Sequence, residues 1–200
     1  MKLRKNDTYY TGTVYEWNLP AGVTCPFAKD CKVIVDRETG KFSYTGGNFK
    51  CYAASAERFP SVRTSRWFNY EFVKAGGVPI IPKDCENVRI HSSGDFFSQA
   101  YFDMWLNLIG EHPEINFWAF TKSINFWIYR LEKIPENLIL TASYGGVFDK
   151  IIPVHNLKSA RVYADISLVP AGMPIDTNDD YARMKGVSFA LLDNHKHKKK

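Results

Sequence analysis

The sequence predicts an α/β protein, folded as a partial (β/α) barrel or as an open parallel sheet with flanking helices and an inserted hairpin. From residue 87 onward, short apolar segments alternate with stretches of helical periodicity, which is the pattern of βαβ units. The chain has 200 residues, whereas a complete eightfold barrel usually takes about 250. We therefore expect one α/β domain over residues 1–194, with its βα core in residues 87–192.

The βα core is expected to contain five strands, over residues 87–92, 115–121, 138–143, 161–165 and 187–192. After the first strand, apolar side chains spaced i, i+3, i+4, i+7 predict a helix that begins at Ser98; they are Phe102, Trp105, Leu106 and Ile109. A second helix is expected after Ser123 as its N-cap, and a weaker one over residues 148–157. Strands joined by such helices run parallel, so their carboxyl ends share one edge of the sheet.

The part of the chain before the core carries most of the cysteines, in residues 17–55. Residues 32–50 are expected to form an inserted hairpin, with its turn at residues 38–41. Residues 52–77 look helical, with a break at Pro60 and a stop at Gly76-Gly77.

Composition excludes a disordered or membrane-spanning chain. Hydrophobic residues make up 45% and charged residues 24%, as in ordinary globular proteins, and no apolar run reaches the roughly 18 residues of a spanning helix. Residues 1–18 contain no apolar leader, so we expect a cytosolic protein without a membrane partner.

The net charge of +5 comes mainly from residues 195–200, a basic tail that holds four lysines. Without these lysines, 22 basic residues face 21 acidic ones. We expect the tail to be disordered, with weak contact to nucleic acid or to a host protein as its candidate role.

Three of the four cysteines fall in loops beside Gly, Pro or charged residues: Cys25, Cys31 and Cys51. Five residues separate the first two and nineteen the next two, which matches no CxxC zinc or thioredoxin spacing. The loop placement favours a metal or cluster site, while a chance set of buried cysteines is the alternative. Cys85 precedes the first core strand, at its amino end, and is left out as a ligand.

Polar residues follow the ends of the expected core strands, where ligands of parallel sheets gather. This rim consists of His91, Ser93, Gly94 and Asp95, then Thr121 and Lys122, then Ser143. We expect it to bind a small molecule, with Ser93, Gly94, Thr121 and Ser143 as binding residues and Gly145-Gly146 admitting backbone approach. His91, Asp95 and Lys122 are the catalytic candidates. The alternative is that these residues only cap helices and meet solvent.

Several motifs in the same order resemble the phage gene product 88 family. They are Leu-Pro-Ala-Gly-Val-Thr-Cys-Pro at 19–26, Cys-Tyr-Ala at 51–53, Arg-Ile-His-Ser-Ser-Gly-Asp-Phe at 89–96, Phe-Trp-Ala-Phe-Thr-Lys-Ser at 117–123, Leu-Thr-Ala-Ser-Tyr-Gly-Gly at 140–146 and Phe-Ala-Leu-Leu at 189–192. The resemblance runs from about residue 17 to residue 192. It implies a viral origin and expression in the cytoplasm of the infected bacterial host.

That family is in turn distantly similar to radical S-adenosylmethionine (SAM) enzymes, in which three cysteines spaced CxxxCxxC hold a [4Fe-4S] cluster above a partial βα barrel. The resemblance implies that Cys25, Cys31 and Cys51 hold such a cluster and that its open iron could bind SAM. The spacing here departs from that pattern, and Lys50 rather than an aromatic residue precedes Cys51.

Two classes of function follow. The first is a cluster-bearing enzyme of redox or small-molecule chemistry that uses the rim residues. The second is a non-catalytic phage metalloprotein that binds a host partner or nucleic acid. In either, the fourth metal position is open or is filled by His91 or Asp95, and zinc held by the three cysteines and one His is the rival to iron and sulfide.

Overall fold

The computed structural model describes residues 3–6, 10, 12–47 and 49–193. Its main sheet has seven strands in the order β1-β2-β5-β6-β7-β8-β9. Their bounds are β1 Arg4–Lys5, β2 Val14–Trp17, β5 Asn87–Ile90, β6 Asn116–Thr121, β7 Leu138–Ser143, β8 Ser159–Tyr163 and β9 Phe189–Leu192. The predicted α/β class is therefore confirmed.

Six strands of this sheet, β2 and β5 to β9, run parallel, and only β1 is antiparallel. They follow one another across the sheet in chain order, so each connection steps to the next strand in the same direction. This is the winding of a partial βα barrel. It also collects the carboxyl ends of all six parallel strands at one edge.

Helices cover one face of the sheet: α2 Gln99–Gly110, α3 Ile124–Ile128 and α4 Ile151–Val154. Their apolar side chains pack on those of β2, β5, β6 and β7 that point the same way, and the largest fully buried members are Trp17, Phe96, Phe102, Trp105 and Phe117. The hydroxyl of Ser98 accepts a hydrogen bond from the Tyr101 N–H at 3.2 Å, so the predicted N-cap of α2 is present.

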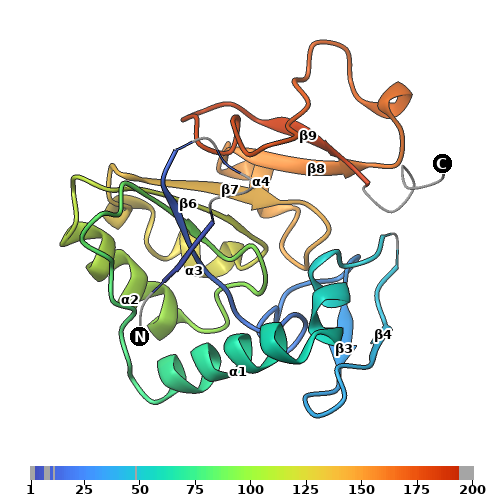
Figure 1. Cartoon of the computed structure of the whole chain (residues 1–200). Coiled ribbons are helices and arrows are strands. Elements are labelled where there is room, and N and C mark those ends of the chain that lie inside the picture. Colours follow the sequence, from blue (N-terminus) through green and yellow to red (C-terminus); the bar gives the residue numbers. More distant parts are fainter. Residues whose placement is uncertain (1–2, 7–9, 11, 48, 194–200) are drawn as a thin grey trace.

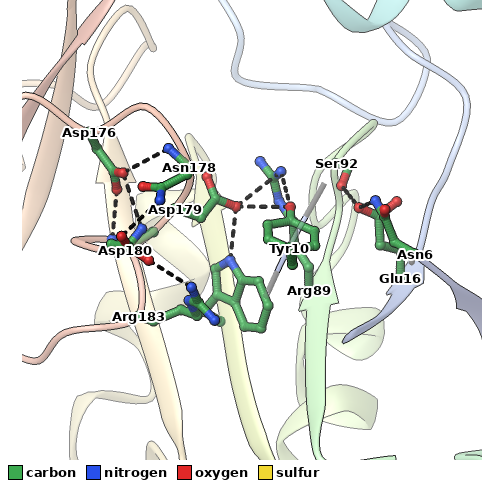
Figure 2. Close-up of polar contacts among 12 residues, drawn as sticks. Asn6, Tyr10, Glu16, Arg89, Ser92, Asp176, Asn178, Asp179, Asp180 and Arg183 are labelled. Carbon is green, nitrogen blue, oxygen red and sulfur yellow. Dashed lines mark hydrogen bonds and ion pairs between the residues drawn. The ribbon is translucent and has the colours of Figure 1, made fainter. Parts of the chain in front are cut away.

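On the other face of the sheet, residues 176–183 and Tyr10 form polar contacts with side chains of the sheet (Figure 2). Asp179 accepts hydrogen bonds from the Tyr10 hydroxyl and the Trp118 indole, each at 3.1 Å, and its Oδ2 pairs with Arg89 at 3.0 Å. Asp176 accepts backbone N–H groups of Asn178, Asp180 and Ala182 and thereby folds this loop. The buried polar cluster of Tyr10, Arg89, Trp118 and Asp179 thus joins segments near both ends of the described chain to the middle of the sheet.

A second, smaller unit precedes the core. It consists of the hairpin β3 Val33–Val35 and β4 Phe42–Tyr44, the 3₁₀ helix η1 Ala53–Arg58 and the helix α1 Pro60–Lys74. Figure 1 shows the hairpin beside the first turns of α1. The inserted hairpin was correctly predicted. The predicted break at Pro60 is present: η1 ends at Arg58 and Pro60 begins α1, because its fixed φ and missing N–H suit a first helical position.

Some predicted bounds were wrong. β5 ends at Ile90, since His91 has a φ of 65° and leaves the strand. β8 spans Ser159–Tyr163, two residues earlier than predicted. The helix expected after Ser123 is divided into α3 and the 3₁₀ helix η2 Leu131–Lys133, and a further 3₁₀ helix, η3 Ile166–Leu168, was not expected. Ser123 precedes α3 but does not cap it, because its hydroxyl donates to the Phe96 carbonyl at 2.6 Å.

β2 is the main omission of the sequence analysis, which found no strand of the main sheet before residue 87. The strand has only four residues, and its apolar signal is too short to stand out from the polar segment around it. The predicted basic tail, residues 195–200, lies outside the described residues, which end at residue 193. None of the described helices is long and apolar enough to cross a membrane.

Candidate functional site at the carboxyl edge of the sheet

The three loop cysteines lie within electrostatic range of one another. Burial is the largest cause that raises the pKa of the Cys25 thiol, and Asp95, Cys51 and Cys31 raise it further. Burial and Cys31 likewise raise the pKa of the Cys51 thiol. Cys25 and Cys31 both lie in the connection from β2 to β3, and Cys51 lies between β4 and η1, so two separate segments bring their thiols to one region.

Backbone N–H groups act on two of these thiols. The N–H dipole of Gly22 lowers the pKa of the Cys25 thiol, and those of Ala54 and Ala53 lower the pKa of the Cys51 thiol, because such a dipole stabilises the thiolate. These effects favour the thiolate form, which binds metal, but burial is the larger effect and the pKa of both thiols stays raised.

The loop of Cys25 is fastened to the loop that follows β5. Leu19 donates its N–H to the Ser93 carbonyl at 2.9 Å, and the Ser93 hydroxyl donates to the Leu19 carbonyl at 2.9 Å. Gly94 has a φ of 89°, and a Cβ there would lie 2.7 Å from both Leu19 Cβ and Thr24 Oγ1. Ser93 and Gly94, predicted as binding residues, therefore hold the cysteine loop in this structure.

The segment from Cys25 to Cys31 is fastened to the turn after β7. The Gly145 carbonyl accepts the N–H groups of Lys29 and Asp30, both at 3.0 Å. The Gly145 and Gly146 N–H groups donate to the Asp149 carboxylate at 2.9 and 2.8 Å. These two glycines were expected to admit a ligand to the backbone, but their N–H groups are already bonded to Asp149.

Asp95 is buried and close enough to Cys25 to raise the pKa of its thiol. Its Oδ1 accepts the Thr121 hydroxyl at 2.6 Å and the Phe96 N–H at 2.8 Å, and its Oδ2 accepts the Lys122 N–H at 2.8 Å. Burial raises the pKa of this carboxyl to about 6, and the three hydrogen bonds act against that rise. Asp95 can therefore hold or release a proton near neutral pH beside Cys25, while Thr121 orients it.

Lys122 brings a positive charge to the same region. Its ammonium group donates to the Ser143 hydroxyl at 2.6 Å, which joins the ends of β6 and β7. The charge also lowers the pKa of the Cys51 thiol. Lys122 and Ser143 thus form a polar pair beside the thiols, and both remain half-buried rather than enclosed.

His91 is turned toward α2. Its Nε2 lies 2.9 Å from the Tyr101 hydroxyl, its ring packs edge-on against Phe96, and only 3% of the residue is exposed. Burial lowers the pKa of this imidazole to about 3, so it is neutral at physiological pH. Nδ1 has no hydrogen-bond partner. Of the two residues expected as a fourth metal ligand, Asp95 rather than His91 is electrostatically coupled to a site cysteine.

Cys85 lies at the amino end of β5, away from the other three thiols. It is 8% exposed, and its thiol donates to the Asn87 carbonyl at 3.6 Å. This position agrees with leaving Cys85 out of the site.

Within the described part of the chain, no group of three or more His, Cys, Asp or Glu side chains is arranged to hold a metal ion.

Three further residues support the site. The Tyr52 hydroxyl donates to the Ser92 carbonyl at 2.6 Å, and Glu57 pairs with Arg66 at 2.8 Å behind the cysteine loops. A charged pair within a helical segment normally indicates a solvated surface. Only the closeness of Tyr52 to Cys51 in the sequence pointed to any of the three.

The family model described as "Gene product 88" matches residues 1–200 of this chain. The Gene 88 protein of Mycobacterium phage L5 is 36% identical over 64 residues, and that of Mycobacterium phage D29 is 34% identical over 64 residues. Each alignment covers 29% of this chain and 27% of the relative, so the chain spans about a quarter of the length of these curated relatives. No solved structure matches the chain.

Proposed function

The chain belongs to the gene product 88 family of phage proteins, and we propose that it is an iron–sulfur protein that holds a [4Fe-4S] cluster on Cys25, Cys31 and Cys51. The observation that carries the proposal is the electrostatic coupling of three thiols from two loops, two of them further influenced by backbone N–H dipoles. Cysteine thiolates are the usual ligands of such clusters, and hydrogen bonds to their sulfurs tune the reduction potential.

The donor set favours a cluster over zinc. A tetrahedral zinc ion at about 2.3 Å from each sulfur needs its thiolates about 3.8 Å apart and usually takes a fourth protein ligand. His91, the expected fourth ligand of zinc, is engaged through Nε2 with the Tyr101 hydroxyl. A [4Fe-4S] cluster is larger than a single ion, so the thiolates that bind it can lie farther apart.

A cluster with three protein ligands supplies an iron that can transfer an electron or bind a ligand. Around it, this chain's own residues would hold a proton at Asp95 and a positive charge at Lys122. Ser143 orients Lys122, and Thr121 orients Asp95. We infer redox or small-molecule chemistry at the carboxyl strand ends, in the cytoplasm of the infected host.

The test is a measurement of iron and acid-labile sulfide, with the visible spectrum, on protein purified without oxygen. We expect about four irons and about four sulfides per chain, with broad absorbance near 400 nm. Cys51→Ala should abolish the cluster, while the matched control Cys85→Ala should retain it. Zinc in place of iron, or iron retained in Cys51→Ala, would overturn the proposal.

A non-catalytic role is the second candidate, and one observation favours it. Ser93, Thr121, Gly145 and Gly146 all direct their polar groups to other parts of the chain. A cluster surrounded by such contacts would serve stability or redox sensing. Binding of SAM to the loaded protein, measured by calorimetry, separates the two, because only the enzyme requires a ligand at the open iron.

A further inference from the structure

A buried ion pair lies behind the cysteine loops. Glu57 Oε1 and Arg66 Nη1 are 2.8 Å apart, with 0% and 11% of their side chains exposed. The same Glu57 oxygen accepts the Ala21 N–H at 3.0 Å, and the same Arg66 nitrogen donates to the Ala53 carbonyl at 3.0 Å. The pair therefore bonds to two segments that are more than thirty residues apart in the chain.

These two contacts fall next to the backbone groups that lower the pKa of the thiols. Ala21 precedes Gly22, whose N–H lowers the pKa of the Cys25 thiol, and the Ala53 carbonyl shares a peptide group with the N–H of Ala54, which lowers the pKa of the Cys51 thiol. A shift of the Glu57 carboxylate would move the Pro20–Ala21 peptide and, through it, the neighbouring N–H of Gly22. A shift of the Arg66 guanidinium would move the Ala53–Ala54 peptide.

We propose that Glu57 and Arg66 are positioning residues, which hold the backbone N–H groups near the sulfurs of Cys25 and Cys51 and set the distance between the two thiols. The redox consequence of this inference rests on the proposed function, whereas the distance between the thiols does not.

Stability alone is a weak reason for such a pair. Desolvation of two charges offsets most of their attraction, and replacement of a buried pair by apolar residues is often neutral or stabilising. One Glu57 oxygen, Oε2, is buried without a hydrogen-bond partner, so the pair is not arranged for the greatest number of contacts. Its bonds to two cysteine segments give it a geometric role.

The test compares two double variants that each remove one negative and one positive charge. Glu57→Gln combined with Arg66→Met removes the buried pair and avoids an unpaired buried charge, which would threaten folding. The control, Arg37→Met combined with Glu71→Gln, removes a pair of similar length, 3.0 Å, whose side chains are 52% and 46% exposed. Circular dichroism verifies that both are folded.

The first readout is the reduction potential of the loaded protein. N–H bonds to the ligand sulfurs stabilise the more negative reduced cluster and so raise its potential. We expect a more negative potential in the Glu57/Arg66 variant and the wild-type value in the Arg37/Glu71 control. Because neither variant changes the net charge, the difference reports geometry.

The second readout needs no cluster. In metal-free, reduced protein, a short bifunctional thiol reagent should link Cys25 to Cys51, and peptide mass spectrometry measures the linked product. We expect linking about threefold slower or more in the Glu57/Arg66 variant, since reactions that depend on proximity are sensitive to displacements of about 1 Å. The control should link at the wild-type rate.

The outcomes separate the two proposals. If wild-type protein carries no cluster, the proposed function fails, and slower linking in the variant still supports the positioning role. If the folded variant keeps both the wild-type potential and the wild-type linking rate, Glu57 and Arg66 are structural only and the inference is overturned.

Discussion

The hydroxyl of Tyr52 lies 2.6 Å from the carbonyl oxygen of Ser92, and this bond joins the segment that carries Cys51 to the end of β5. The ring of Tyr52 is otherwise exposed at 54%. The bond therefore connects the segment that carries Cys51 to the sheet, and it lies outside the core.

Tyr52→Phe should remove this bond and leave the apolar ring in place. We expect the free energy of unfolding to fall by about 1 kcal/mol, the usual net worth of one hydrogen bond, and the cluster to be lost faster in air. Urea unfolding and the decay of the visible absorbance measure the two effects. Tyr129→Phe is the control, because Tyr129 is 71% exposed. Equal decay rates in the two variants would contradict the role of Tyr52.

Gly145→Ala should destabilise the protein by two separable effects. Gly145 has a φ of 95°, and a Cβ would lie 3.0 Å from Phe49 Cζ and 3.2 Å from Asp30 Cβ. Gly172→Ala is a matched control, because its φ is 82° and nothing lies within 4 Å of its Cβ. Both variants incur a backbone cost of about 1–2 kcal/mol.

Overpacking adds about 1–3 kcal/mol in Gly145→Ala alone, and it also loosens the Cys25–Cys31 segment. Urea unfolding and iron content measure the difference. Equal free energies of unfolding in the two alanine variants would mean that overpacking against Asp30 does not destabilise Gly145→Ala.

The pH dependence of stability should contain a contribution from His91. Its pKa is about 3 in the folded protein against an ordinary value of 6.5, so between these pH values the unfolded chain binds the additional proton. Stability due to this group is therefore full above pH 6.5 and falls as the pH drops toward 3, by at most about 1.4 kcal/mol per pH unit.

His91→Asn removes this titration and keeps a residue that tolerates the φ of 65°. We expect the stability difference between wild type and variant to shrink steadily below pH 6.5, as measured by urea unfolding at several pH values. The raised pKa of Asp95, about 6, acts in the opposite sense in both proteins and cancels in this difference. A difference that did not vary with pH would refute the buried, neutral state of His91.

Lys122→Met should make the reduction potential of the loaded protein more negative. The ammonium group near Cys51 favours extra negative charge on the thiolates, and its removal withdraws that support. Ser143→Ala is the control, because it removes the 2.6 Å hydrogen bond but leaves the charge. A redox titration followed by absorbance measures both, and an unchanged potential in Lys122→Met would place its charge outside the reach of the site.

Asp179→Asn tests the polar group on the second face of the sheet (Figure 2). Asn accepts the φ of 63° at this position, but it leaves the Arg89 guanidinium, 13% exposed, without its carboxylate. We expect a loss of about 3–5 kcal/mol, measured by urea unfolding. Asp180→Asn weakens the surface pair with Arg183 and the exposed hydrogen bond from Asn178, and it should cost less than about 1 kcal/mol.

The βα core could be predicted from the sequence because its segments carry strong periodic signals. β7 has the bounds that were predicted, and α2 begins after the predicted cap, Ser98. The short strand β2 could not be found, because four residues give too little alternation and its burial comes from partners such as Trp105.

For the site, residue type and loop position were enough to single out Cys25, Cys31 and Cys51 and the rim around Asp95. The partners of the rim were not predictable. The sequence Gly145-Gly146 predicts a turn that is open to ligands. Only the fold shows that the N–H groups of both glycines donate to the Asp149 carboxylate. His91 was placed on the rim by its position in the chain, but its positive φ turns the ring toward Tyr101.

The bond between Tyr10 and Asp179 joins residues 169 positions apart in the chain, and this has a consequence for synthesis. A ribosome releases all three site cysteines, and the strands β2 and β5 to β8, before Asp179 emerges. Until then Arg89 and Trp118 lack the carboxylate that they share. Contacts of such long range form late in folding, so the nascent protein should collect its thiols first and close the second face of its sheet last.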